Sequence, residues 1–202
     1  EIKNLHINCV AEISGKKLVF GTQAGLSCFD LNKEQYYINK RKANLENENI
    51  KTIYQASNNT IWIGSLAKGV ENFDLNKGTL NKYSTNSLPP FQLQGNSINS
   101  IIEDKQHNIW VGTWGNGLSK ISPNGIQTYR HDEHNTSTIS DDAIFALAIS
   151  TKGVLWVATE DKGLNKFNTI NQTFDHITRR QGDRRSLADN SLQCIFFDSH
   201  EN

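Results

Sequence analysis

The chain has 202 residues, of which 36% are apolar, enough for one large domain or two small ones. Its 21 basic and 21 acidic residues give a formal net charge of zero, which removes the usual electrostatic reason to expect nucleic acid or an anionic membrane surface as partner. The longest apolar run, Ala143–Ile149, is much shorter than the roughly 20 residues of a membrane-spanning helix. No signal peptide is visible and the sequence lacks Met, so we expect Glu1 not to be a natural start and the chain to be part of a longer protein.

One motif recurs four times along the chain. It reads KLVFGTQAGLSCFD at 17–30, TIWIGSLAKGVENFD at 60–74, NIWVGTWGNGLSKIS at 108–122 and VLWVATEDKGLNKFN at 154–168. Successive copies lie 43 to 48 residues apart, a spacing typical of propeller blades or of helical-pair repeats. The apolar stretches are short and alternating, and Gly, Asn, Asp and Ser interrupt them, so the pattern favours strands.

Each copy predicts four strands in chain order. The first strands are 7–12, 50–55, 98–103 and 144–149, each followed by a polar turn and the second strand, which contains Trp in all copies but the first. The third strands end at Phe29, Phe73, Ile121 and Phe167. The fourth strands contain QYYI (35–38), LNKYS (80–84), IQTYR (126–130) and TFDHI (173–177). This is the four-stranded antiparallel meander of a β-propeller blade, and the fold class is therefore all-β.

We expect one partial propeller over 1–202, with about four and a half blades. The predicted units are approximately 5–48, 49–96, 97–142, 143–190 and an incomplete unit at 191–202. In the last unit the offset of the earlier copies would place the Trp at position 204. An open arc leaves exposed sheet edges, so we expect a fragment of a larger propeller or pairing with a second copy.

Three positions of the repeat have a structural explanation. The third residue of the first strand is small, as expected where neighbouring blades converge: Cys9, Thr52, Ser100, Ala146 and Cys194. The Trp of the second strand is expected to fill the gap between blade sheets: Trp62, Trp110 and Trp156. The Gly after the turn is expected at positive φ: Gly25, Gly69, Gly117 and Gly163. The three Cys have no metal-like spacing, and a disulfide framework is not expected.

The repeat resembles the two-component regulator propeller repeat. The resemblance is strongest at SIIEDKQHNIWVGTWGNGLSKIS (100–122) and extends over essentially the whole chain, including the linkers 129–144 and 176–192. Val19 in place of Trp, Ala158 in place of Gly and the Pro pair within 86–98 depart from the pattern. The resemblance implies a periplasmic ligand-sensing region of a hybrid histidine kinase in an inner-membrane-anchored protein. The kinase parts would lie elsewhere, since these residues contain no kinase or receiver motif.

Candidate ligand contacts lie on the loops of one propeller face. In an up-and-down blade, the turn between the second and third strands shares a face with the linker to the next blade, and binding residues concentrate on loops. The candidates are Trp114, Asn116, Glu160, Asp161, Lys162, His131, Arg179 and Arg180.

Two of these suggest particular chemistry. Trp114 has non-aromatic counterparts in the other copies, so it could stack on a sugar ring while Asn116 binds hydroxyl groups, or it could pack on a neighbouring linker. The Arg-rich stretch 178–185 could hold an acidic sugar, form a solvated loop or make salt bridges between blades. HDEH (131–134) has two His three residues apart, but no third ligand is indicated, and no metal or cofactor is expected.

The predicted function is recognition of a glycan-derived oligosaccharide, with a signal passed to an attached kinase. One alternative is an interaction scaffold that binds no small molecule. Another is a propeller glycosidase or lyase, for which Glu103, Asp104, Glu160 and Asp161 are the available acids, although Glu103 occupies a repeated polar strand end.

Overall fold

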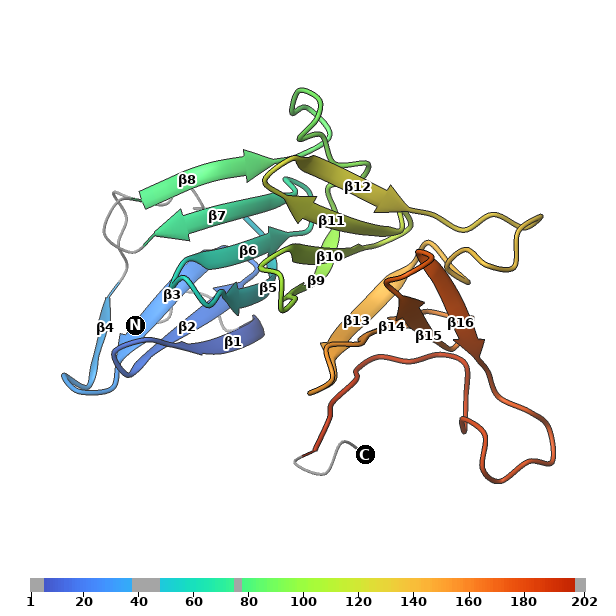
Figure 1. Cartoon of the computed structure of the whole chain (residues 1–202). Helices are drawn as coiled ribbons and strands as arrows, with labels where there is room; N and C mark the ends of the chain where they lie inside the picture. Colours follow the sequence, from blue (N-terminus) through green and yellow to red (C-terminus); the bar gives the residue numbers. More distant parts are fainter. Residues whose placement is uncertain (1–5, 38–47, 75–77, 199–202) are drawn as a thin grey trace. The chain divides into compact units, whose positions relative to one another are not determined.

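The structure, a computed structural model, describes residues 6–37, 48–74 and 78–198. In these ranges all the strands belong to four four-stranded antiparallel sheets, each with its strands in chain order (Figure 1). The predicted all-β fold of four-stranded meanders is confirmed. The described ranges contain no helix with the length and apolar character needed to cross a bilayer.

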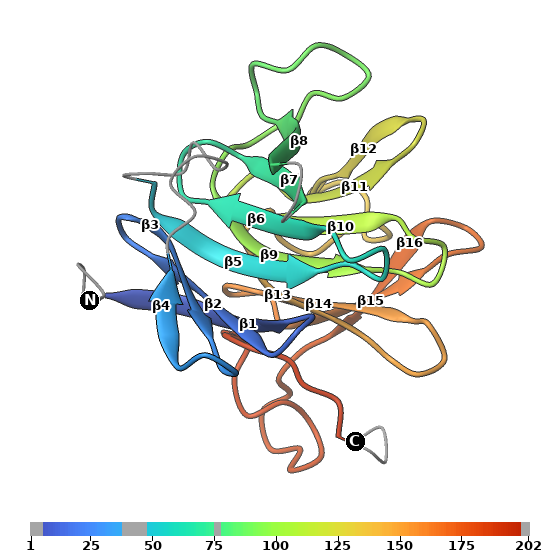
Figure 2. The ribbon, with the colours of Figure 1, turned by 90° about the vertical axis from the view of Figure 1, so that its left-hand side faces the viewer.

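The strands fall into two compact units, residues 1–101 and 102–202, which are described in turn. In the first unit, one sheet contains β1 (Ile7–Ile13), β2 (Lys17–Thr22), β3 (Gly25–Asp30) and β4 (Gln35–Tyr37). The next contains β5 (Ile50–Gln55), β6 (Ile61–Ser65), β7 (Val70–Asp74) and β8 (Gly78–Tyr83). In Figure 2 the segment after β8 rises as a loop beyond the end of that strand; it carries the Pro pair.

The unit boundary falls within β9, the first strand of the third sheet. This sheet contains β9 (Ile98–Glu103), β10 (Ile109–Thr113), β11 (Leu118–Ser122) and β12 (Gly125–Tyr129). The fourth contains β13 (Ile144–Ile149), β14 (Leu155–Thr159), β15 (Leu164–Asn168) and β16 (Thr173–Ile177).

Residues 191–198 lie outside any strand, and 199–202 lie outside the described residues, as do 1–5, 38–47 and 75–77. The incomplete fifth unit and the exact limits of the blades therefore stay predictions.

Small residues on the first strand allow close packing in the first unit. Cys9 pairs with Gly21 across β1 and β2, and a Cβ on Gly21 would lie 2.5 Å from Cys9 Sγ and 2.7 Å from Ile50 Cγ2. The same arrangement recurs at Gly64, where a Cβ would lie 2.7 Å from Thr52 Cγ2. Both positions must therefore be small, because the first strand of the following sheet approaches them closely.

A feature that the sequence pattern did not reveal explains this geometry. The register of the first strand shifts just before the small residue in three sheets: between Ile7 and Cys9, between Ile50 and Thr52, and between Ile144 and Ala146. Such an irregularity adds an unpaired residue and bends the strand.

Trp110 is the centre of the core in the second unit. It is 2% exposed, and its ring meets Phe167 of β15 edge-on with centroids 5.2 Å apart, so it fills the space between two sheets as predicted. Its Nε1 donates to Asp104 Oδ2 at 2.8 Å, which satisfies the only polar group of the ring. Trp62 is buried as well, whereas Trp156 is only partly buried and meets Phe197 edge-on.

Candidate functional site

The turns between second and third strands adjoin the linkers between blades. In the second unit the N–H of Gly117 donates to the carbonyl of Asp142 at 2.8 Å, and the N–H of Gly163 donates to that of Asn190 at 2.9 Å. Both glycines have positive φ, 77° and 79°, as the sequence predicted. Within this unit the predicted sharing of one face by turns and linkers is therefore confirmed.

A hydroxyl group at the end of each second strand shapes these turns. Thr113 Oγ1 donates to the carbonyl of Gly117 at 2.8 Å and accepts the N–H of Asn116 at 3.1 Å. Thr159 makes the equivalent bonds to Gly163 and Lys162. In the sequence, this bond is indicated by the Thr or Ser that directly follows the Gly or Ala of the second strand. The sequence interpretation missed this pattern.

Trp114 lies in the turn between β10 and β11 with half of its surface exposed, 50%. Its ring meets Phe145 of β13 edge-on, with centroids 5.2 Å apart and planes at 73°. Its backbone forms an isolated antiparallel bridge with Ala143. The side chain is thus held by a neighbouring aromatic ring while half of it still faces solvent, and sugar stacking on its free part stays a prediction.

Asp142 holds the two ends of the linker 130–142 together. Its carboxylate accepts the N–H of His131 at 2.8 Å and two guanidinium bonds from Arg130, at 3.0 and 2.6 Å. Its carbonyl accepts the N–H groups of Gly115 and Gly117. One residue therefore joins the linker to the turn that carries Trp114.

The middle of the same linker is attached to the fourth sheet. The N–H of Phe174 donates to the carbonyl of Ser137 at 2.9 Å, and His176 Nε2 lies 2.7 Å from the carbonyl of Thr138. Ile139 is fully buried in the core that surrounds Trp110. The linker is consequently attached to β16 at Ser137 and Thr138 and buried at Ile139 and Ser140, while residues 131–137 are exposed to solvent.

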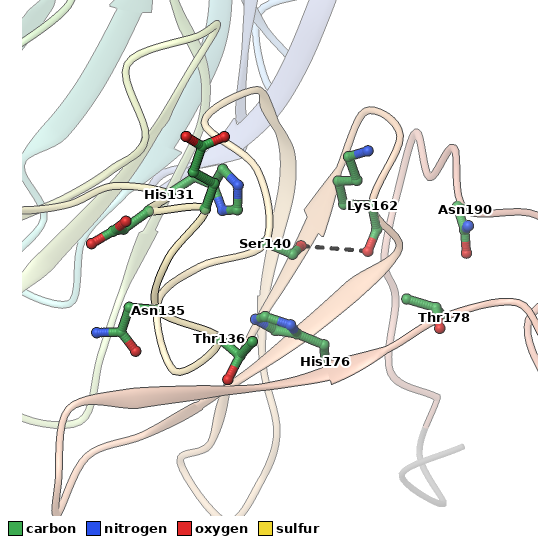
Figure 3. A pocket seen from close by; sticks show the side chains of 10 residues that line it. His131, Asn135, Thr136, Ser140, Lys162, His176, Thr178 and Asn190 are labelled. Carbon is green, nitrogen blue, oxygen red and sulfur yellow. Dashed lines mark hydrogen bonds between the residues drawn. The ribbon is translucent and has the colours of Figure 1, made fainter.

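A pocket of about 380 Å³ lies between this linker and the end of β16 (Figure 3). His131 and Ser140 line it from the linker, His176 and Thr178 from β16 and the residues after it, and Lys162 from the turn between β14 and β15. The remaining lining residues are Asp132, Glu133, Asn135, Thr136 and Asn190. Its volume lies within the range of small-molecule sites, which is roughly 300–1,000 Å³.

The structure brings together only some of the predicted site residues. Of the eight candidates, His131 and Lys162 line the pocket. Trp114 and Asn116 lie on the turn between β10 and β11, and Glu160 and Asp161 on the turn between β14 and β15. Arg179 and Arg180 use their backbone N–H groups to close the linker 179–190, bonding to Asn190 Oδ1 and Ser186 Oγ. Their side chains do not line the pocket.

Sequence reasoning missed His176, Thr178 and Asn190. His176 lies within the predicted fourth strand TFDHI and Thr178 directly follows it, and no repeat position marks them as different. Only the course of the linker across β16 makes them part of a site.

The HDEH segment closes a loop and does not gather ligands for a metal. His131 Nδ1 lies 2.9 Å from the carbonyl of Ile139, and Asp132 Oδ1 accepts the N–H of His134 at 2.9 Å. Within the described ranges no group of three or more His, Cys, Asp or Glu side chains is placed to hold a metal ion.

Two of the four candidate catalytic acids have structural partners. Asp104 accepts bonds from Asn108 and Trp110, and Glu103 pairs with His107. Both therefore support the turn between β9 and β10.

Sequence comparison identifies the repeat. Residues 44–67 and 92–115 match the family described as two component regulator propeller. Among curated proteins the chain is similar to histidine kinase P4 of Formosa agariphila, with 29% identity over 92 residues, which cover 42% of this chain and 6% of that protein.

Structural comparison finds propeller domains of similar kind. The extracellular domain assigned to the hybrid two component system BT4673 of B. thetaiotaomicron superposes with a TM-score of 0.78 and 25% identity, over 98% of this chain and 25% of that one. The corresponding domain of BT3049 from the same organism superposes with a TM-score of 0.73 and 27% identity, over 90% of this chain and 24% of that one. Virginiamycin B lyase from Staphylococcus aureus superposes with a TM-score of 0.67 and 11% identity, over 90% of this chain and 58% of that one. At this identity the likeness shows the fold alone.

This chain spans about a quarter of the length of the two-component extracellular domains that it matches. Its four antiparallel meanders and the two matched segments nevertheless agree with the repeat predicted from the sequence. The chain therefore carries repeats of the two component regulator propeller family.

Proposed function

We propose that the chain is part of the periplasmic ligand-sensing region of a two-component sensor kinase. In this proposal it recognises a glycan-derived oligosaccharide and passes a conformational change to a histidine kinase domain elsewhere in the same inner-membrane-anchored protein. The similarity to extracellular domains of hybrid two component systems and to a histidine kinase supports the class of protein. No catalytic step is assigned to this chain.

Trp114 is the observation that carries the proposal. An aromatic ring that is half exposed and held in place by Phe145 offers a preformed flat surface, which loses little conformational entropy when a sugar ring stacks on it. The adjacent Asn116 can exchange hydrogen bonds with hydroxyl groups at the edge of that ring. The further proposed contacts are Glu160, Asp161, Lys162, His131, Arg179 and Arg180.

The test is calorimetric titration of the protein with a panel of plant and host oligosaccharides. We expect Trp114→Ala to weaken binding at least about ten-fold and Trp114→Phe to retain part of the affinity, since stacking contributes on the order of 1 kcal/mol beyond the buried area. Leu66→Ala is the matched control, because Leu66 lies at the same repeat position and is similarly exposed, at 43%. Failure of every oligosaccharide to bind, or unchanged affinity of Trp114→Ala, would overturn the proposal.

A further inference from the structure

The pocket beside β16 contains two imidazole rings whose tautomers the surrounding backbone determines. His131 Nδ1 lies 2.9 Å from the carbonyl of Ile139, and His176 Nε2 lies 2.7 Å from the carbonyl of Thr138. A carbonyl oxygen can only accept a hydrogen bond, so each of these two nitrogens must carry the proton.

In the neutral rings the opposite nitrogens are therefore acceptors. His131 Nε2 and His176 Nδ1 each have a lone pair and no hydrogen. Both rings line the same pocket, one from the linker and one from β16 (Figure 3). Two residues that line the pocket therefore each carry one ring nitrogen that can accept a hydrogen bond.

The other lining groups make the pocket unfavourable for an anion. Asp132 and Glu133 add two carboxylates, against the single ammonium group of Lys162. A carboxylate ligand would be repelled by these two like charges, less so by Glu133, whose side chain is largely exposed and lies 3.4 Å from His134 Nε2.

Donors for hydroxyl oxygens are also present. Lys162 supplies an ammonium group, and Asn190, whose Oδ1 accepts the N–H of Arg179 at 2.7 Å, retains its amide NH₂ as a donor. A sugar hydroxyl both donates and accepts, which matches this mixed set.

We infer that this pocket binds an uncharged, polyhydroxylated sugar ring and discriminates against acidic sugars. The inference rests on the proposed function for the ligand being a saccharide, and adds the place where it binds and its charge. It also separates this pocket from Arg179 and Arg180, which the sequence suggested for an acidic sugar and which do not line it.

The experiment follows the ring nitrogens of the two histidines by ¹⁵N-resolved NMR on the ¹⁵N-labelled protein in mildly alkaline buffer. Without sugar, we expect the proton on Nδ1 of His131 and on Nε2 of His176. Methyl glycosides of glucose, galactose, mannose and xylose are then added, followed by glucuronate and galacturonate. We expect at least one neutral glycoside to shift both rings, and the uronates to bind at least ten-fold more weakly than that glycoside.

Opposite tautomers, no ring shift with any neutral glycoside, or tighter binding of a uronate would each overturn the inference. His176→Phe removes the acceptor and should abolish the neutral-sugar response, whereas His176→Gln keeps a donor toward Thr138 and tests whether loss of that bond alone disturbs the linker. Because the tautomers and titrations are read on the unaltered protein, a variant that fails to fold leaves the test intact.

The variants also separate this inference from the proposed function. If Trp114→Ala abolishes oligosaccharide binding and His176→Phe leaves it unchanged, the sensor proposal stands and the pocket assignment fails. If His176→Phe abolishes binding and Trp114→Ala does not, the pocket assignment stands and Trp114 is not the stacking surface.

Discussion

Asn165 and Ser140 form a reciprocal pair of hydrogen bonds between a blade and the linker that precedes it. Asn165 Oδ1 accepts the N–H of Ser140 at 2.9 Å, and its Nδ2 donates to Ser140 Oγ at 2.8 Å. Asn165 is completely buried, and Ser140 lines the pocket. The amide therefore determines where one wall of the pocket stands, although it does not itself line the pocket.

Asn165→Ala should lower the free energy of unfolding by about 1–3 kcal/mol. The substitution leaves the N–H and hydroxyl of Ser140 without their buried partner, and the cost of an unsatisfied buried polar group is of this size. Urea denaturation followed by tryptophan fluorescence measures the change. Asn124→Ala is the control, because Asn124 is an exposed turn residue and its replacement should change stability by less than about 0.5 kcal/mol. Equal effects of the two substitutions would show that the linker is not anchored through Asn165.

Asp142 provides a second test of the linker. Asp142→Asn should change the free energy of unfolding by less than about 1 kcal/mol, because Arg130 of this ion pair is half exposed to solvent and the amide oxygen can still accept the N–H of His131. Asn190 already makes the equivalent bond in the next linker, to Arg179. Asp142→Ala removes the acceptor and should cost about 1–2 kcal/mol. A larger loss for the Asn variant than for the Ala variant would contradict this account.

The repeat pattern predicted the strands because each blade must satisfy the same local requirements. Gly117 and Gly163 mark the turns by their positive φ, and Trp110 marks the second strand by its burial between sheets. These are local or nearest-neighbour constraints, and a repeat displays them several times in one sequence.

The candidate site was predicted less completely, because it depends on contacts that do not repeat. His131 and Lys162 were selected from the loop face and line the pocket, whereas His176 reaches it only through the path of the preceding linker. Asn165 reads in the sequence as an ordinary polar residue of a third strand, and nothing local indicates its bond to Ser140, which lies 25 residues earlier.

Gly64→Ala tests the close packing of neighbouring first strands. The added Cβ would lie 2.5 Å from Ile98 Cγ2 and 2.7 Å from Thr52 Cγ2, so overpacking should cost about 1–3 kcal/mol of unfolding free energy. In the fourth sheet the position of Gly64 is occupied by Ala158. Its partner on the first strand is Ala146, which is smaller than Thr52. Denaturation of Gly64→Ala/Thr52→Ala, which reproduces that pair, should show partial recovery. A fully tolerated single substitution would show that the packing is looser than described.

The three thiols should differ in reactivity. Burial raises the pKa of Cys9 and of Cys28 to about 11, whereas Cys194 is exposed. The thiolate is the reactive form, and at pH 8 only roughly one in a thousand of the buried thiols would be ionised. Alkylation with iodoacetamide, followed by peptide mass spectrometry, should label Cys194 at least about a hundred-fold faster. Similar rates at all three positions would contradict the raised pKa values of the partly buried Cys9 and Cys28.

The same pKa shifts predict a loss of stability in alkaline solution. The thiols ionise near 9.0 when the chain is unfolded and near 11 when it is folded, so between these values the unfolded state binds fewer protons. The contribution is complete below pH 9 and declines as the pH rises toward 11. Because Lys and Tyr side chains also titrate there, the measurement is a difference: urea unfolding of the wild type and of Cys9→Ala/Cys28→Ala at pH 8 and pH 10.5. The double variant should be less stable at pH 8 but lose less stability between the two pH values. An equal loss in both proteins would show that folding does not raise the pKa of the two thiols.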